Sequence, residues 1–288
     1  MTGGKGNNDA AGSLPTPRGE DAARPQRAEG SGRVVAKLRG GATRLTELFQ
    51  EGSAKIRLPR PTSQALEAVL MNTAGGLTGG DRFDWTVEAG PGAEISVTTP
   101  ACERVYKSAG GAATIANRLV LGPGAHIDWL PQETILFEQS RLQRHLDAEL
   151  GEGATLTALE AVLLGREAMG EAARSAMLDD QWRISRGGRL IHAEANRLSA
   201  TDLERDALSL LAGNNAFATL VHIADNAEDR LAAVRALIPA EAKAAASAVG
   251  ERLVVRILAP SGLALRRLVT PLLVELSAGR ALPRLWST

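Results

Sequence analysis

Apolar and polar residues alternate through the middle of the chain, on both sides of a recurring Gly-x-Gly-Ala tetrapeptide. The tetrapeptide occurs at 90–93, 122–125 and 151–154, about 30 residues apart. Small or apolar residues stand at alternate positions before each first glycine and after each second glycine. This period of two on both sides of a tight turn is typical of a strand, a turn and a second strand.

Three copies of this unit predict stacked β layers, in which each layer buries one face on its neighbours. Three separate hairpins in a β-sandwich would give the same local pattern, and the sequence leaves that alternative open. We therefore expect a mainly β fold with a stacked, β-helical or solenoid-like arrangement of strands and a few C-terminal α-helices.

The C-terminal third carries the helical patterns. Helices are predicted for 226–238, where Pro239 ends the segment, and for the Ala-rich stretch 241–249. A further helix is predicted for 265–276, which Pro271 should bend or break. Residues 253–258 are continuously apolar apart from one arginine and predict a buried strand.

Residues 1–32 are rich in Gly, Pro, Ala and charged residues and contain almost no large apolar side chains. Such a segment buries too little apolar surface to offset the entropy of ordering, which predicts a disordered N-terminal tail. Order is expected to begin near Arg33. No linker divides the rest of the chain, so residues 33–288 are expected to form a single domain.

Charge and composition narrow the class of protein. The 33 Lys and Arg residues balance the 33 Asp and Glu residues, which argues against a basic footprint for nucleic acid. No apolar run approaches the roughly 20 residues that span a bilayer, and the N-terminus lacks a secretory apolar region. We expect a cytoplasmic protein without membrane contact. A single cysteine excludes a disulfide framework within the chain.

The segment 71–82 holds four glycines in six positions and ends in an acid and a base. The four glycines are Gly75, Gly76, Gly79 and Gly80, and the acid is Asp81. The segment lacks the Gly-Lys-Ser/Thr ending of a P-loop, and a strand pattern rather than a crossover helix comes after it. Nucleotide binding is therefore not expected. We expect a shaped backbone loop between two strands, in which Asp81 either caps loop amides or presents a carboxylate.

No catalytic constellation is evident. The four histidines show neither the i,i+4 spacing nor the HxH or HExxH patterns of metal sites, so no metal ligand is assigned. His126 alternates with Ile127 and is expected to point away from the buried face of its strand. Cys102 has no nucleophile-elbow glycines and no evident histidine partner, which favours a buried structural thiol over a nucleophile.

Residues 129–138 form the segment densest in aromatic and apolar side chains. Two interpretations stay open for Trp129: core packing at a bulge, or an anchor in a protein interface. Glu133 and Glu138 are acids in apolar surroundings. Burial of either one would be unusual and would indicate a functional role.

Several segments, taken in order, resemble the urease accessory protein UreD (UreH) family over about 33–286. The motifs that carry the resemblance are GGLTGGD at 75–81, TTP at 98–100, WLPQETI at 129–135, LGR at 164–166 with GE at 170–171, and PRLW at 283–286. Two positions depart from many relatives. Thr73-Ala74 stands where prolines often precede the first glycine pair, and Ala173 stands where many relatives have Phe.

The resemblance implies a mostly β, non-enzymatic maturation factor. Proteins of this family join UreF and the GTPase UreG, with two copies in the complex. That assembly inserts nickel into apo-urease, and GTP hydrolysis belongs to UreG. The resemblance implies no tightly bound cofactor, only a transient contact with nickel.

Three acids that close or follow a motif are our candidates for lining a nickel path: Asp81, Glu138 and Glu171. The structural alternatives are a cap for Asp81 and an ion pair with Arg166 or Arg174 for Glu171. The candidate scaffold or interface residues are Gly75, Gly76, Gly79, Gly80, Trp129 and Glu133.

A second class of function also stays open, namely a stand-alone β-solenoid binding module or a carbohydrate-active protein. Enzymes of that kind display clustered carboxylates on successive turns. The residues after the three turns are Glu94, His126 and Thr155, which do not form such a cluster.

Overall fold

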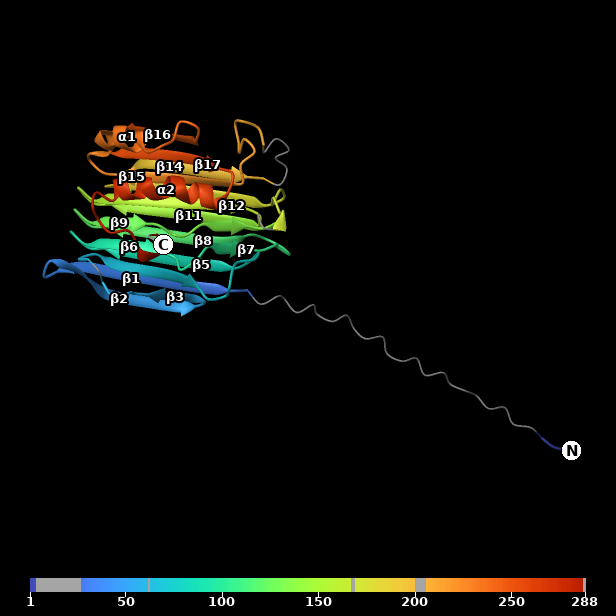
Figure 1. Ribbon diagram of the computed structural model, residues 1–288. Coiled ribbons are helices and arrows are strands. Elements are labelled where there is room, and N and C mark those ends of the chain that lie inside the picture. The colour runs from blue at the N-terminus through green and yellow to red at the C-terminus, as the bar shows by residue number, and fades with distance from the viewer. Residues whose placement is uncertain (4–26, 62, 167–168, 200–205, 287–288) are drawn as a thin grey trace.

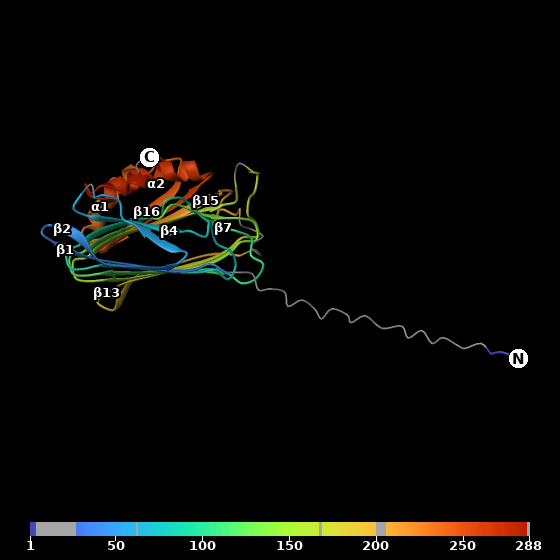
Figure 2. The same ribbon diagram turned by 90° about the horizontal axis from the view of Figure 1, so that it is seen from below.

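Two β-sheets face each other, and their strands are stacked along one axis (Figures 1 and 2). The computed structural model describes residues 1–3, 27–61, 63–166, 169–199 and 206–286. Among these residues, sheet A has seven strands in the order β14-β13-β11-β8-β5-β1-β2. They are β1 (Glu29–Arg39), β2 (Ala42–Gly52), β5 (Arg82–Ala89), β8 (Ala113–Leu121), β11 (Arg141–Leu150), β13 (Met177–Arg186) and β14 (Arg189–Leu198).

Sheet B has ten strands within the described part of the chain, eight of them in the order β16-β17-β15-β12-β9-β6-β4-β3. Of the other two, β10 pairs with β12, and β7 pairs with β10. They are β3 (Ala54–Arg57), β4 (Leu66–Asn72), β6 (Glu94–Thr98), β7 (Glu103–Val105), β9 (His126–Trp129), β10 (Thr134–Leu136), β12 (Thr155–Leu164), β15 (Ala216–Ile223), β16 (Lys243–Val249) and β17 (Arg252–Ala259). A short 3-10 helix, Arg284–Trp286, lies near the C-terminus.

Each Gly-x-Gly-Ala turn carries the chain from sheet A to sheet B. The strands before the turns, β5, β8 and β11, are parallel neighbours, and so are the strands after them, β6, β9 and β12. The turns stack as well, because the Gly122 amide donates to the Ala89 carbonyl at 2.8 Å. A Cβ at Gly122 would lie 2.7 Å from the Pro91 nitrogen of the turn below. The predicted solenoid-like stack is confirmed, and the repeats are not separate hairpins.

The hydrophobic core has two parts. The larger part lies between the sheets, and the smaller part lies between the outer face of sheet B and the helices α1 (Ala227–Ala236) and α2 (Gly262–Leu276). Figure 2 shows both helices on that side of the molecule. Consequently both faces of β9 are buried. His126 does point away from the Ile127 side, but it is only 5% exposed, which corrects the expectation of an open face.

Three sequence expectations about the elements need correction. Residues 241–249 contain strand β16 rather than a helix, because pairing with β17 overrides the helix preference of alanine. Helix α2 runs through Pro271 without a break. Strand β1 begins at Glu29, before the expected start at Arg33. The rest of the predicted tail, 4–26, lies outside the described residues. No helix of the described part is both long and apolar enough to span a membrane.

Candidate functional site

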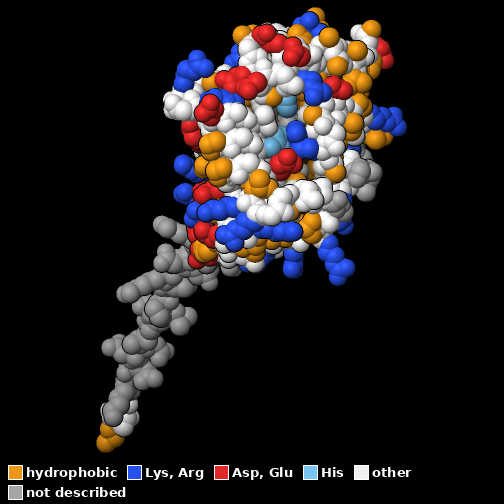
Figure 3. All heavy atoms as spheres, turned by 90° about the vertical axis from the view of Figure 1, so that its left-hand side faces the viewer, with side chains coloured by type: hydrophobic (Ala, Val, Ile, Leu, Met, Phe, Trp, Pro, Cys, Tyr) orange, Lys and Arg blue, Asp and Glu red, His pale blue; other side chains and the backbone are white. Residues whose placement is uncertain are grey.

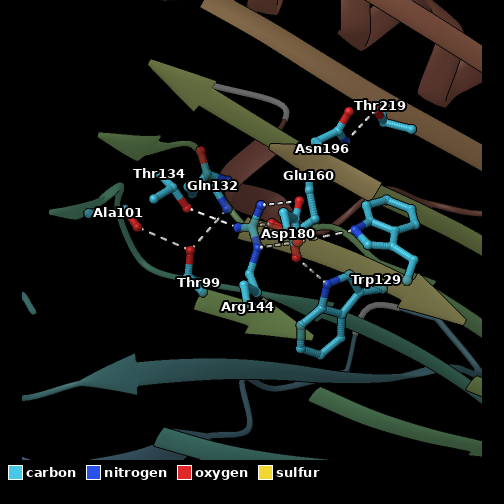
Figure 4. A network of polar contacts seen from close by, with 11 residues as sticks. Thr99, Ala101, Trp129, Gln132, Thr134, Arg144, Glu160, Asp180, Asn196 and Thr219 are labelled. Atoms are coloured by element: carbon cyan, nitrogen blue, oxygen red, sulfur yellow. Dashed lines mark hydrogen bonds and ion pairs between the residues drawn. The ribbon is translucent and has the colours of Figure 1, made fainter. Parts of the chain in front are cut away.

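A cluster of charged side chains interrupts the apolar interior between the two sheets (Figure 4). Arg144 of β11 lies between Asp180 of β13 and Glu160 of β12. Its Nε and Nη2 donate to the Asp180 carboxylate at 3.0 and 2.8 Å, and its Nη1 pairs with Glu160 and donates to Thr134 Oγ1 at 3.1 Å. All four side chains are buried. The guanidinium is therefore shared by two carboxylates that have almost no contact with water.

Each carboxylate of the cluster also accepts a hydrogen bond from an indole. Trp129 Nε1 donates to Glu160 at 3.0 Å, and Trp182 Nε1 donates to Asp180 at 3.3 Å. Burial raises the pKa of Glu160 above its ordinary value, whereas the neighbouring Arg144 opposes that rise. The indoles fix the carboxylates in place, so the geometry of the cluster does not depend on Arg144 alone.

Three members of the cluster, Thr134, Arg144 and Glu160, line the inner end of a cavity of about 250 Å³. The outer end is lined by the exposed Gly75 and the buried Gly76 of the glycine loop, together with the half-buried Cys102 and Glu103. Between the two ends, Asn117 lines the cavity and is only 3% exposed. Its Oδ1 has no hydrogen-bond partner among the described residues. A buried amide oxygen without a partner is costly, which marks this position as one that can receive a ligand or water.

Glu103 lies at the outer end of the cavity. Burial raises its pKa to about 7, and a hydrogen bond from Asn72 Nδ2 at 3.3 Å partly opposes the rise. Near neutral pH this side chain therefore exchanges readily between its charged and neutral forms. Such a carboxylate can accept a cation and also release it.

The glycine loop, between β4 and β5, is held tightly rather than left open for a ligand. The Asp81 carboxylate accepts the amides of Ala28 at 2.8 Å and Thr78 at 2.7 Å. A Cβ at Gly79 would collide with the Ser108 hydroxyl and lie 2.5 Å from the Gly110 carbonyl oxygen. Asp81 thus caps loop amides, as one of the two sequence alternatives predicted, and it does not line the cavity.

The other two candidate acids, Glu138 and Glu171, lie together outside the cavity. Glu138 accepts the amide and the hydroxyl of Ser175, the amide at 2.9 Å. Glu171 accepts the Glu138 amide at 2.9 Å and pairs with Arg166 at 2.5 Å, and the hydrogen bond from Arg166 lowers the Glu171 pKa. The predicted pairing with Arg166 is present. These contacts connect two loops, and neither acid lines the cavity.

The segment that starts at Trp129 belongs mainly to the core. Trp129 is 3% exposed, which favours the core-packing interpretation over an interface anchor. Glu133 is buried as well and lies 3.4 Å from Arg266 Nη1 and 3.5 Å from the Cys102 sulfur. Arg266 also stacks over the Trp286 ring at 4.6 Å. Glu133 therefore connects this segment to α2 and to the C-terminal end of the fold.

Cys102 behaves as a structural thiol. Burial, reinforced by Glu133, raises the pKa of Cys102 to about 11. We expect alkylation by iodoacetamide at pH 8 to be about 250-fold slower than for a free cysteine, because the thiolate fraction falls from roughly a quarter to about 0.1%. Mass spectrometry of timed samples measures the rate, and urea-unfolded chain is the control. A folded rate within threefold of the unfolded rate would contradict the assignment.

Histidines do not complete a metal site. No group of three or more His, Cys, Asp or Glu side chains in the described ranges is arranged to hold a metal ion. The side of the molecule seen in Figure 3, which is the left-hand side of Figure 1, shows recessed histidine side chains beside basic and acidic ones. His126 Nε2 lies 2.9 Å from Asp128 Oδ1, and burial lowers the pKa of His222 to about 4. His222 is therefore a neutral, buried side chain near pH 7.

The sequence analysis missed the buried cluster, although a signal for it exists. Apolar and polar residues alternate along β11, and its apolar positions face the interior. Arg144 occupies one of these inward positions, between Leu142 and Leu146. Three more polar residues occupy such inward positions: Asn117, Glu160 and Asp180. A search for polar or charged residues at the inward positions of successive strands would have located the site.

Comparison with known proteins identifies the relatives of this chain. The model of the family described as UreD urease accessory protein matches residues 28–287. A protein named urease accessory protein UreD from Chelativorans sp. (strain BNC1) is 60% identical over 262 residues, which cover 91% of this chain and 95% of that protein. A protein of the same name from Rhizobium etli is 51% identical over 92% of this chain and 97% of its own length. Another, from Agrobacterium fabrum, is 48% identical over 93% of this chain and 95% of its own length. The chain belongs to the UreD urease accessory protein family.

Proposed function

We propose that this chain is a non-enzymatic maturation factor that works with UreF and UreG in the cytoplasm and helps to insert nickel into apo-urease. Two copies act within the complex, and GTP hydrolysis belongs to UreG. The name of the relatives supports the link to urease. The observation that carries the nickel part is the cavity between the sheets, whose lining includes the oxygen donors Asn117, Glu103 and Glu160.

Nickel is the cargo in this proposal, and the cavity gives it a protected route. A borderline divalent ion in transit needs contacts with oxygen or nitrogen donors that are weak enough to release it. Glu103 supplies such a donor at the outer end. The acids Asp81, Glu138 and Glu171 remain candidates from the sequence, although their carboxylates already accept hydrogen bonds from backbone or side-chain groups.

Strand β2 offers a surface for a protein partner. It forms one edge of sheet A, and its residues from Arg44 onward are exposed. Three large apolar side chains stand on it with more than a third of their surface exposed: Leu45, Leu48 and Phe49. A long edge strand with exposed apolar residues is suited to pairing with another chain. This surface supports the scaffold part of the proposal.

Co-expression with UreF, UreG and urease tests the function. We expect the chain to co-purify with these proteins and Glu103→Ala to lower the nickel content of purified urease severalfold, because the mouth of the cavity loses its carboxylate. Asp81→Ala, Glu138→Ala and Glu171→Ala are measured in parallel, at equal abundance of the chain. Glu241→Ala is the matched control, because Glu241 is an exposed acid before β16 that neither lines the cavity nor belongs to β2.

Two results would overturn the proposal. One is normal nickel content and normal partner binding in all four acid variants, which would remove the cavity and the motif acids from any nickel route. The other is retention of the chain on a sugar matrix without any co-purifying protein, which would favour the binding-module alternative.

A further inference from the structure

The buried Arg144 lines the cavity, and oxygen atoms of three side chains surround its guanidinium. The carboxylates of Asp180 and Glu160 and the hydroxyl of Thr134 all contact its guanidinium. Figure 4 shows the arginine pointing into the space between the two carboxylates. Asn117, in the same cavity, adds a buried amide oxygen that has no partner within the described part of the chain.

The charges of this cluster do not balance when both carboxylates are ionised. Asp180 and Glu160 then carry two negative charges, and the guanidinium carries one positive charge. A divalent cation in place of the guanidinium would balance both carboxylates. Carboxylate and hydroxyl oxygens together form a weak oxygen site for a borderline ion such as Ni²⁺, whose stable sites favour nitrogen and sulfur ligands.

Stability alone does not explain the cluster. Apolar side chains of similar volume often replace a buried ion pair without loss of stability. The buried cluster is accounted for if its carboxylates also have to hold a cation other than Arg144.

We propose that Arg144 is an internal cation that masks a divalent-cation site formed by Asp180, Glu160 and Thr134, and so closes the inner end of the cavity to nickel in the free chain. This inference rests on the proposed nickel route. Opening requires the arginine side chain to leave the two carboxylates, while the indoles of Trp129 and Trp182 keep them in position. The adjoining cavity of about 250 Å³ provides room for that movement.

Direct binding of Ni²⁺ to the purified full-length chain tests the inference without urease or partners. We expect Arg144→Gln to bind one additional Ni²⁺ per chain by equilibrium dialysis, at least tenfold more tightly than the wild-type chain. Arg144→Lys keeps a cation at the site and is expected to bind no additional nickel. The triple variant Arg144→Gln/Asp180→Asn/Glu160→Gln, which lacks the carboxylates, is expected to lose the added site.

Removal of Arg144 leaves two buried carboxylates and can unfold the chain, so a second measurement accompanies the first. Thermal unfolding of Arg144→Gln is followed with and without Ni²⁺, and we expect nickel to raise its Tm or restore its fold, with no such effect on the triple variant. Unchanged nickel binding and no nickel-dependent stabilisation in Arg144→Gln would overturn the inference. Equal nickel binding by Arg144→Lys would overturn it too. Neither result bears on co-purification with UreF and urease, so the proposed function is tested separately.

Discussion

Gly79→Ala is expected to lower the free energy of unfolding by about 2–3 kcal/mol, because the new methyl group meets atoms that cannot move away easily. Its Cβ would collide with the Ser108 hydroxyl and lie 2.5 and 2.7 Å from the carbonyl oxygens of Gly110 and Gly111. The loop would have to shift relative to the segment between β7 and β8. Urea unfolding of the variant and the wild-type chain measures the change.

Gly75→Ala is the matched control in the same loop. A Cβ at Gly75 has open space around it, and only its positive φ of 81° opposes the substitution. We expect a cost of about 1 kcal/mol from that backbone strain. Equal losses of stability for the two variants would show that close packing around Gly79 does not hold the loop.

Asp81→Asn is expected to destabilise the chain by about 3 kcal/mol, because two hydrogen bonds to a buried carboxylate are lost or weakened. Through these two bonds the Asp81 carboxylate connects the loop amide of Thr78 with the amide of Ala28, which lies just before β1. We expect hydrogen exchange of the β1 amides to rise together with the loss of stability. This result would show that the loop fastens the first strand to the stack.

Asp84→Asn is the control for the charge change. Asp84 pairs with Arg82 at the surface, where the two side chains are 40% and 67% exposed. An exposed pair of this kind contributes less than about 1 kcal/mol. If Asp81→Asn proved as mild as Asp84→Asn, the two amide contacts would not be what fixes the loop.

The repeats were predictable because their information is local. The two glycines of each Gly-x-Gly-Ala turn and the alternation beside them specify a strand, a turn and a strand within about a dozen residues. The second glycine has a positive φ in all three turns, as in Gly124 at 63°. The stack then arises from repetition, because each unit has an apolar face that only another unit can cover.

Two errors came from strand pairing that overrides the residue preferences within a segment. Glu29–Gly32 contains no large apolar residue, yet β1 forms there because it pairs with both β2 and β5. A Cβ at Gly30 would lie 2.8 Å from the Phe83 ring, so the small residue is what lets the strands approach. Likewise, only β17 makes a strand of the Ala-rich segment 243–249. The secondary-structure preferences of the residues within a segment do not show which other strand that segment pairs with.

The site was harder to predict than the fold for a different reason. The motif acids were chosen by position next to recognisable segments, and the structure places Asp81, Glu138 and Glu171 in contacts that shape loops. The cavity side chains come from strands whose patterns look ordinary except at one inward position each. The family resemblance drew attention to the motifs. The buried charges are found only by asking, for each strand, which residues point toward the interior.

The order of the cluster along the chain has a consequence for biosynthesis. Arg144 leaves the ribosome before both of its carboxylate partners, since Glu160 lies one strand later and Asp180 two strands later. The coils up to β11 can stack during translation, but the space between the sheets would then hold an unpaired guanidinium. We therefore expect the newest coil to stay open to water until β12 and β13 have been made.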